Sequence, residues 1–397
     1  MVFNAEKYLF SLETKGIKLG LSRTHALLKK CGSPHKDVSI IQVLGTNGKG
    51  STCAILYILL NLQYNVGLYT SPHLYSFRER IRYNGLSIPT KEVELFLSKY
   101  QKIINSLNAS FFEIMTVMAV WYFKKKKVDY AIMETGLGGK FDSVTACQAK
   151  IFAITSISMD HEHILGDTIE LIAKEKIAAI SNQSEVYSAP QKYEVEKLIE
   201  QQCKINKSEL SKISINEKLQ LSLNGKHQIE NGSLALEIAK KLLVEWNEDS
   251  INKCLMSINW HGRNQILGTN PTIIFDVGHN EDGINSFLEF MGTQQAKKYS
   301  KKTLLFSIQK NKNISKIAQK LECSFDQIFY SQTNTKYSMS FSSIKQCFKS
   351  VKYIQSPIDA LNMTINNAKK DELIAIVGTH YWGDSVKSFF NICFDNI

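Results

Sequence analysis

The sequence predicts an α/β fold: a mainly parallel sheet covered by helices, followed by a second and smaller unit of the same kind. Short apolar runs alternate with helical patterns along the chain, which is typical of parallel sheets. A second such series begins near Thr272. The length of 397 residues is ample for two or three domains, each with its own core.

The first series contains four apolar runs that we predict to be strands, at 38–44, 66–70, 128–134 and 151–157. Helical patterns follow or separate these runs, at 52–62, 91–107, 113–123 and 168–180. The polar segment 204–225 has weak periodicity, and no element is predicted there.

The second series predicts strands at 273–275, 303–308, 327–331 and 373–377, with a helix at 282–291. Turn residues between the two series indicate a connection. The predicted organisation is therefore a first domain at 1–261, a hinge at 262–271 and a second domain at 272–397.

Composition narrows the function classes. No apolar run approaches the ~18 residues that a membrane helix needs, and the first residues lack a signal-peptide pattern. The eight cysteines form no C-x-x-C pair, so reduced thiols and a cytoplasmic location are expected, without a zinc site. The net charge is +11, but the lysine runs at 124–127 and 297–302 resemble solvated helix ends and loops. No nucleic acid or membrane partner is expected.

A glycine-rich segment, Gly45 to Thr52, joins the first predicted strand to the first helix. Backbone N–H groups and the helix dipole at such a turn attract phosphate. Lys49 would add a charge on the outer phosphates, and Ser51 or Thr52 could add a hydroxyl for Mg²⁺. The spacing departs from G-x-x-x-x-G-K-[ST], since Gly50 separates Lys49 from Ser51. Two interpretations remain, a variant nucleotide loop and a chance glycine-rich turn.

Polar side chains follow the other strands of the first series, where ligands gather in open parallel sheets. Ser71 follows the second strand, Glu134 ends the third, and His161 follows the fourth. These three groups could form a Mg²⁺ shell near Lys49, although histidine is an unusual ligand for so hard an ion. The alternatives are a helix cap, a surface charge and a strand-end turn.

Three further residues lie near predicted strand ends. Asp276 and His279 follow the first strand of the second series, and Arg263 in the hinge would suit a phosphate or carboxylate. The alternative for this cluster is a capped βα turn. Lys176 lies on the predicted helix after His161, next to Lys174 and Glu175. From these charged neighbours alone it is expected to be a solvated lysine on the surface of the helix.

The order of these motifs along the chain resembles the folylpolyglutamate synthase/dihydrofolate synthase family of Mur-type ligases. The matching segments are Gly45–Thr52, 70–74, 77–81, 111–113, 134–139, 160–166, 174–176, 227–231, 262–263 and 276–280. Any one of these motifs is weak, but together and in order they are specific.

The resemblance implies a P-loop ATPase domain and a smaller Rossmann-like C-terminal domain, with the active site in the cleft between them. It implies ATP-dependent amide formation between a folate-type carboxylate and the amine of L-glutamate, through an acyl phosphate. ATP would be held by Thr46, Asn47, Gly48, Lys49, Gly50, Ser51, Asn231, Arg263 and Asp276. Mg²⁺ would be held by Ser71, Glu134 and His161. Lys176 would be carbamylated, and His279 would lie near the attacking amine or acyl phosphate.

The resemblance also implies a pterin side, formed by Ile17, Lys18, Leu19, Gly20, Ser110, Phe111, Phe112, Glu113, Phe141, Asp142 and Ser143. The two phenylalanines would face the pterin ring, the alternative being plain core packing. Glu113 or Asp142 would accept N–H groups of the ring. Departures from the family pattern occur at Ser22 and at 141–145 on this side, and at 378–383 near the C-terminus. Retention of Asp142 favours dihydropteroate as a substrate.

The expectation is therefore a monomeric, bifunctional enzyme that adds L-glutamate to dihydropteroate and to reduced folates. A monofunctional folylpolyglutamate synthase and a nucleotide-gated binding protein are the alternatives. A ligase for UDP-sugar peptides is disfavoured, because only about forty residues precede Gly45 and no UDP-binding domain is expected before it.

Overall fold

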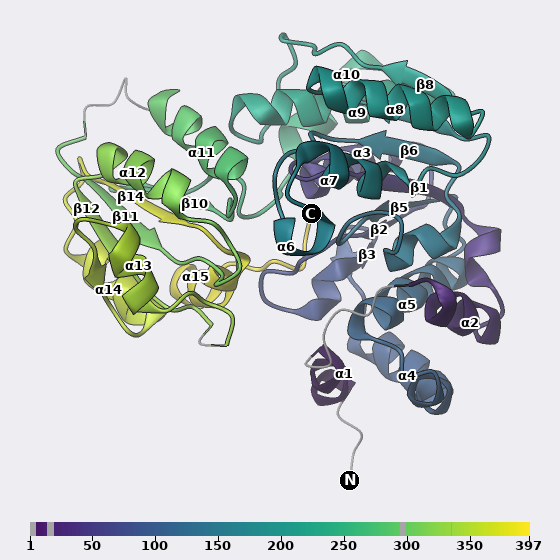
Figure 1. The fold of residues 1–397 in the computed structure, drawn as a ribbon, viewed down its shortest axis with the longest axis horizontal. Coiled ribbons are helices and arrows are strands. Elements are labelled where there is room, and N and C mark those ends of the chain that lie inside the picture. The colour runs from purple at the N-terminus through teal and green to yellow at the C-terminus, as the bar shows by residue number, and fades with distance from the viewer. Residues whose placement is uncertain (1–4, 14–19, 294–298, 335) are drawn as a thin grey trace.

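The computed structural model describes residues 5–13, 20–293, 299–334 and 336–397. The chain forms two lobes, each a sheet between two layers of helices, as Figure 1 shows. The predicted α/β fold with mainly parallel sheets is confirmed.

The first sheet has eight strands in the order β4-β3-β2-β5-β1-β6-β7-β8. All neighbours from β2 to β8 pair in parallel, whereas β3 and β4 form an antiparallel edge. The strands are β1 (Ser39–Leu44), β2 (Val66–Tyr69), β3 (Ile81–Tyr83), β4 (Leu86–Ser87), β5 (Tyr130–Glu134), β6 (Ile151–Ile154), β7 (Glu185–Ser188) and β8 (Glu209–Lys212).

Helices cover both faces of this sheet because each buries an apolar side against it. One face packs on α3 (Lys49–Leu60), α9 (Lys226–Leu242) and α10 (Glu248–Ser257). The other face packs on α1 (Ala5–Glu13), α2 (Ser22–Lys30), α4 (Thr90–Ser106), α5 (Phe111–Lys126), α7 (Ile169–Ile177) and α8 (Tyr193–Ile205). The short α6 (Glu162–Leu165) follows His161 at the strand ends.

The second sheet has six strands in the order β13-β12-β11-β14-β10-β9, parallel except for β9. Its strands are β9 (Gln265–Thr269), β10 (Thr272–Asp276), β11 (Lys302–Phe306), β12 (Gln327–Tyr330), β13 (Lys352–Tyr353) and β14 (Leu373–Val377). Its helices are α11 (Glu281–Thr293), α12 (Ser315–Ser324) and α13 (Phe341–Cys347) on one face, and α14 (Pro357–Asn366) and α15 (Gly383–Phe390) on the other.

The strands β3, β4, β7 and β13 were not predicted from the sequence, and two further differences concern the predicted hinge and the unassigned segment. Residues 262–271, predicted as a hinge, contain β9, because the turn residues Gly262 and Pro271 flank a strand that pairs with β10. The unassigned segment 204–225 contains β8 at the edge of the first sheet. No helix among the described residues is long and apolar enough to cross a membrane.

The last residues of the chain return from the second domain to the first. Ile397 N–H donates to the carbonyl of Gly85, and Asn396 pairs with Leu86 of β4. The buried Arg82 guanidinium donates to the carbonyl of Phe394 at 2.9 Å. In Figure 1 the C-terminus accordingly lies over the first domain, at the end of the yellow loop that leaves the left lobe.

Candidate active site

The glycine loop between β1 and α3 requires its glycines. Gly48 precedes α3 with a φ of 83°, and a Cβ there would lie 2.1 Å from Asn231 Oδ1. Gly45 has a φ of 139°, and a Cβ there would lie 1.9 Å from Thr155 Oγ1. The loop is therefore wrapped closely against its neighbours, and its backbone takes a conformation that other residues adopt only with strain.

The predicted ATP residues surround one cavity of about 540 Å³. The glycine loop and Asn231 line it from the first domain, and Arg263 and Asp276 line it from the chain that follows. The Ser51 and Thr52 hydroxyls are buried at the start of α3, and neither has a hydrogen-bond partner within the described part of the chain. Orphaned hydroxyls at a helix N-terminus, next to glycine backbone, suit phosphate oxygens and a hard cation.

The carboxylate of Glu134, at the end of β5, accepts a hydrogen bond from Ser71 N–H at 2.8 Å. Burial raises the pKa of Glu134, which the positive charge of Lys49 partly offsets. A Cβ on Gly50 would lie 3.6 Å from Glu134 Oε2, so this carboxylate reaches the glycine loop. Three of the predicted groups thus meet at one point, as the parallel strand ends require.

Glu134 lines the nucleotide cavity, whereas His161 lines a second cavity. Ser71 lines both cavities. Burial lowers the pKa of His161 to about 3, so the ring is neutral and able to ligate. No three His, Cys, Asp or Glu side chains among residues 5–13, 20–293, 299–334 and 336–397 lie close enough to hold a metal ion between them. The predicted set has two such groups, with the Ser71 hydroxyl and phosphate oxygens to complete it, which is a suitable oxygen-rich shell for Mg²⁺.

Lys176 on α7 is buried, with the residue only 5% exposed, so the solvated-lysine alternative is wrong. Its amine donates to the carbonyl of Gly45 at 2.8 Å, directly behind the glycine loop. Gly139 holds the helix there, because a Cβ at that position would lie 2.1 Å from the Lys176 carbonyl oxygen. Burial and the charge of Lys49 lower the pKa of Lys176 to about 7, which leaves much of the amine neutral.

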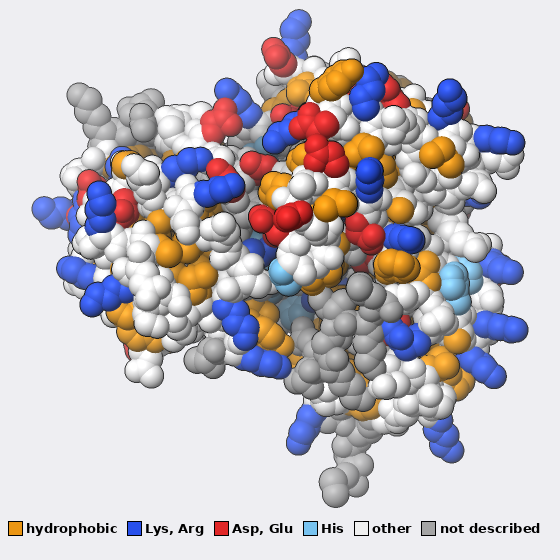
Figure 2. All heavy atoms as spheres, viewed as in Figure 1, with side chains coloured by type: hydrophobic (Ala, Val, Ile, Leu, Met, Phe, Trp, Pro, Cys, Tyr) orange, Lys and Arg blue, Asp and Glu red, His pale blue; other side chains and the backbone are white. Residues whose placement is uncertain are grey.

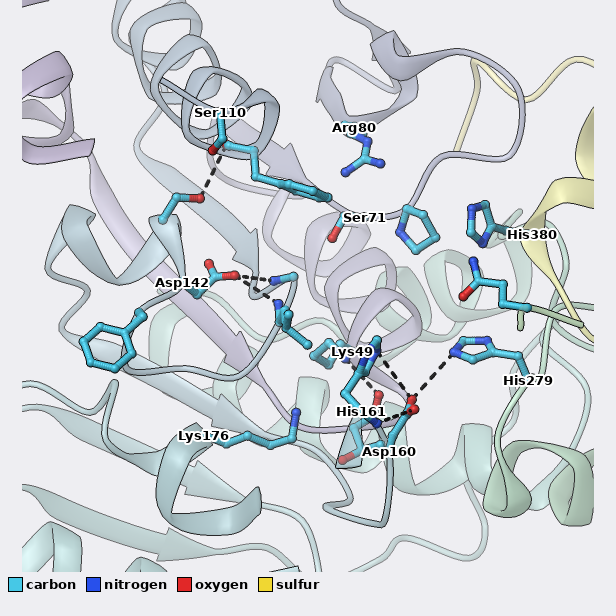
Figure 3. Close-up of a pocket in the computed structure, with 18 of the residues that line it drawn as sticks. Lys49, Ser71, Arg80, Ser110, Asp142, Asp160, His161, Lys176, His279 and His380 are labelled. Carbon is cyan, nitrogen blue, oxygen red and sulfur yellow. Dashed lines mark hydrogen bonds and ion pairs between the residues drawn. The ribbon is translucent and has the colours of Figure 1, made fainter. Parts of the chain in front are cut away.

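A cluster around Asp160 joins the two domains, and the dashed lines in Figure 3 converge on its carboxylate. Lys312, in the loop after β11, donates to Oδ1 at 2.5 Å, and Asn280 donates to Oδ2 at 3.2 Å. His279 Nε2 lies 3.7 Å from Oδ2. Burial alone would raise the pKa of Asp160, but the His279 hydrogen bond and the charges of His279 and Lys312 hold it well below its usual range.

A second polar link crosses the cleft at the glycine loop. The Asn47 and Asn280 side chains exchange hydrogen bonds, at 3.0 and 3.2 Å. Asp160, Asn280 and Lys312 were not predicted as site residues from the sequence. Lys312 had a usable signal, because it follows a predicted strand of the second series, where the same strand-end argument applies.

The second cavity, of about 300 Å³, contains most of the predicted pterin side. It is lined by Gly20, Ser110, Phe112, Glu113, Phe141, Asp142 and Ser143. Phe111 instead lies in the core, 1% exposed, with its ring edge-on to that of Phe112. Ile17, Lys18 and Leu19 lie outside the described residues.

Both predicted pterin-binding carboxylates already hold protein groups. Glu113 accepts a hydrogen bond from Ser110 N–H at 2.7 Å, as part of the capping box that begins α5. It also accepts one from Arg23 Nε at 3.0 Å. Asp142 accepts three backbone N–H groups, from Gly136, Leu137 and Val144. Each carboxylate oxygen has two lone-pair sites, so acceptance of a ligand N–H remains chemically open to both and stays a prediction.

Arg80, which belongs to the matching segment 77–81 but was not predicted as a site residue, lines the second cavity. Its guanidinium faces the rings of Phe111 and Phe112, at 5.1 and 5.4 Å from their centroids. Its Nε donates to His73 Nδ1 at 2.9 Å. A cation stacked on aromatic rings is thereby presented to any anionic ligand there.

The excess positive charge of the chain is spread out on the face that Figure 2 shows. Lysine and arginine side chains lie mostly singly around the outline of both lobes, while histidine side chains are visible in the hollow between them. The two cavities are lined by side chains of both signs, the basic ones including Lys49, Arg80, Arg263 and Lys312 and the acidic ones Glu134, Asp142, Asp160 and Asp276.

Comparisons with known proteins agree with this geometry. Residues 43–218 match the Mur ligase middle domain, and residues 262–380 match the Mur ligase glutamate ligase domain. A dihydrofolate synthase/folylpolyglutamate synthase of Bacillus subtilis is 29% identical, over 94% of this chain and 95% of its own. One of Buchnera aphidicola is 33% identical, over 69% of this chain and 70% of its own.

Solved structures share the fold. Escherichia coli FolC in complex with DHPP and ADP has a TM-score of 0.88, with 24% identity and 98% of each chain covered. The Yersinia pestis bifunctional folylpolyglutamate synthase/dihydrofolate synthase, complexed with AMPPNP and a Mn ion, has a TM-score of 0.86, with 24% identity and 97% of each chain covered. The chain therefore belongs to the folylpolyglutamate synthase/dihydrofolate synthase family, and it is an ATP-dependent glutamate ligase with the middle and glutamate ligase domains of the Mur ligases.

Proposed function

We propose that this ligase phosphorylates the carboxylate of dihydropteroate, or of a reduced folate, where its two cavities meet, and that L-glutamate then attacks the acyl phosphate. The observation that carries this proposal is a shared wall. Thr46, Lys49, Ser71 and His279 line both the nucleotide cavity and the pterin-side cavity. A terminal phosphate in one cavity would thus adjoin a carboxylate in the other.

Such a reaction depends on position and charge more than on a protein nucleophile. Lys49 would neutralise charge on the transferred phosphoryl group, and the N–H groups of 46–51 would hold the phosphates behind it. Arg263, which lines the nucleotide cavity together with Asp276, would hold an outer phosphate or the ribose of the nucleotide in place. His279 would lie beside the reacting carboxylate, where it adjoins Asp160.

Divalent metal fits the residues present. Ser71, Glu134 and His161 would hold Mg²⁺, which would neutralise charge on the phosphates and on the carboxylate that receives the phosphoryl group. Support comes from the donor set and from the Yersinia pestis protein, whose structure contains a Mn ion.

Carbamylation of Lys176 is the second part of the proposal. CO₂ adds to the neutral form of an amine, and burial gives Lys176 a pKa of about 7. The carbamate would be anionic and would adjoin the cationic groups behind the glycine loop, of which Lys49 already acts on Lys176. That neighbourhood stabilises a negative charge.

We propose that one chain, working as a monomer in the cytoplasm, carries both glutamate-adding activities. A single chain supplies both walls of the cleft, and all eight cysteines are free thiols. The Bacillus subtilis relative is named for both activities, and the Escherichia coli structure contains DHPP. Asp142 remains at its predicted position in the cavity that would receive the pterin.

The test is phosphate release from ATP in the presence of Mg²⁺ and L-glutamate, with either dihydropteroate or tetrahydrofolate as acceptor. Release with both acceptors, accompanied by the glutamylated product, is expected. Release with tetrahydrofolate alone would leave a monofunctional folylpolyglutamate synthase. Reactions without L-glutamate or without acceptor are the controls, and equal phosphate release in them would contradict the proposal.

A further inference from the structure

His380 lies where the second domain presents its strand ends to the cleft. It begins a short 3-10 turn, His380–Trp382, just after the central strand β14. The neighbouring strands β10 and β11 end before His279 and Lys312. All three residues line the 300 Å³ cavity, and in Figure 3 His279 and His380 project into it from the same side.

The ring of His380 is held in place by packing against other aromatic rings. Its centroid lies 4.2 Å from that of Tyr381, which stacks at 5.8 Å on Tyr337 with the ring planes 6° apart. Within the described residues no group hydrogen-bonds the imidazole, although the ring is only partly exposed. Two polar ring nitrogens are therefore available to whatever enters the cavity.

The surroundings of the ring are cationic. Burial, and then the charges of His279 and Arg80, lower the pKa of His380 to about 3, and Arg263 and Lys312 act in the same direction. The imidazole is therefore neutral near pH 7 and binds a proton weakly, so it suits the role of a hydrogen-bond donor better than that of a general base. Such surroundings suit an anionic ligand, because the neighbouring positive charges attract it and the neutral imidazole can donate an N–H hydrogen bond to it.

We infer that the His380 ring donates a hydrogen bond to a carboxylate oxygen of the L-glutamate that attacks the acyl phosphate. This inference rests on the proposed function, because only that function brings an amino-acid carboxylate to this wall. The shape of the cavity supports it: the pterin-side residues lie on the first domain, whereas His380 and Lys312 face them from the second. His380 would thus help to select a dicarboxylic amino acid and to position its amine.

The test compares His380→Phe, which keeps the ring packing on Tyr381 but removes the donor, with His380→Gln, which restores an N–H group. Loss of a hydrogen bond to a charged group predicts a rise in KM for L-glutamate of about tenfold or more in His380→Phe. We expect the KM for ATP and dihydropteroate to change less than about threefold, and His380→Gln to recover most of the loss. His25→Phe, at an exposed position of α2, is the matched control.

Analogues separate the two carboxylates of the amino acid. If His380 contacts the side-chain carboxylate, the difference between wild type and His380→Phe should vanish with L-2-aminobutyrate, which lacks that carboxylate and its acceptor oxygens. If it contacts the α-carboxylate, the difference should vanish with 4-aminobutyrate, which lacks the α-carboxylate. A KM for L-glutamate unchanged in His380→Phe, or an equal rise for ATP, would overturn the inference.

Direct binding keeps this inference distinct from the proposed function. Calorimetric titration of L-glutamate into each protein with ADP and Mg²⁺ requires no turnover. Wild type that binds L-glutamate tenfold more tightly than His380→Phe supports the role of His380 even if neither folate acceptor is used. Equal binding by both proteins overturns it even if the wild type is a fully active ligase.

Discussion

Lys312 of the second domain forms an ion pair with Asp160 of the first, with 2.5 Å between Nζ and Oδ1 and both side chains more than nine-tenths buried. Burial lowers the pKa of Lys312, which the negative charge of Asp160 counteracts. The charge of Lys312 is thus stabilised in its buried position by Asp160, and Asp160 is stabilised by Lys312 together with His279 and Asn280. The domains are held in register at the point where the two cavities adjoin.

Asp160→Asn should therefore destabilise the protein. It leaves Lys312 buried without a counter-charge, which costs about 3–5 kcal/mol in comparable pairs. Denaturant unfolding would measure the loss, and Asp160→Asn/Lys312→Met should recover part of it. The control is Lys124→Met, which breaks the exposed Lys124–Asp37 pair and should cost less than about 1 kcal/mol. A loss as small as that of the control would show that the buried pair is not required.

Lys49→Ala should abolish turnover and leave the fold intact. The amine lies on the wall common to both cavities, where charge develops during phosphoryl transfer. Loss of such a group lowers kcat by about 100- to 1,000-fold or more. The phosphate-release assay measures this, with circular dichroism as the check of folding and the exposed Lys36→Ala as the control. A fully active Lys49→Ala protein would contradict the assignment of Lys49 to the transferred phosphoryl group.

Lys176 should make stability depend on pH in one direction. Its pKa is about 7 in the folded protein against an ordinary 10.5, so between these values the unfolded chain binds the additional proton. Stability should therefore rise as pH increases through that window. In CO₂-free buffer, wild type should gain on the order of 2 kcal/mol relative to Lys176→Met between pH 7 and pH 9. Parallel unfolding curves at each pH measure the difference.

The same two proteins test carbamylation. Adding bicarbonate to CO₂-depleted wild type should raise its turnover, because the neutral amine then acquires the carbamate. Lys176→Met should be weakly active under both conditions. Wild-type activity that is insensitive to CO₂ depletion, together with full activity of Lys176→Met, would remove Lys176 from the reaction.

Gly139→Ala should displace α7, which carries Lys176, and so disturb the active site. Its Cβ would lie 2.1 Å from the Lys176 carbonyl, so the backbone of α7 has to move. We expect a loss of about 1–3 kcal/mol in stability, as for other overpacked positions, with lower turnover. Gly292→Ala is the control, since it meets nothing within 4 Å and lies in a helix that alanine favours. Comparable melting of the two variants would contradict this account of Gly139.

Much of the fold could be predicted because its strands are short apolar runs with polar residues at their carboxyl ends. The same pattern located Ser71, Glu134 and His161 from the first sheet. β9 was not predicted, because an edge strand between two turns carries little hydrophobic signal: three of its five positions are only partly buried and the other two are exposed.

The site residues that sequence reasoning missed depend on how the two domains meet. Asp160 could be read only as a strand-end polar group, since its partner Lys312 lies 152 positions away and belongs to no recognised motif. Phe111 and Phe112 are adjacent and chemically identical, and only the angle of α5 decides which faces the core. Such choices are made by packing between distant segments, which periodicity does not record.

The return of the chain end to β4 has a mechanical consequence. The domains are joined covalently where the chain crosses near Gly262. They are joined a second time, by backbone hydrogen bonds, where Asn396 and Ile397 pair with Leu86 and Gly85. Two separate connections restrict the relative motion of two domains to rotation about one axis, whereas a single linker allows rotation about several. Opening of the cleft would then be a rotation about the line through both attachments, which returns His279, Lys312 and His380 to the same places opposite the first domain each time it closes.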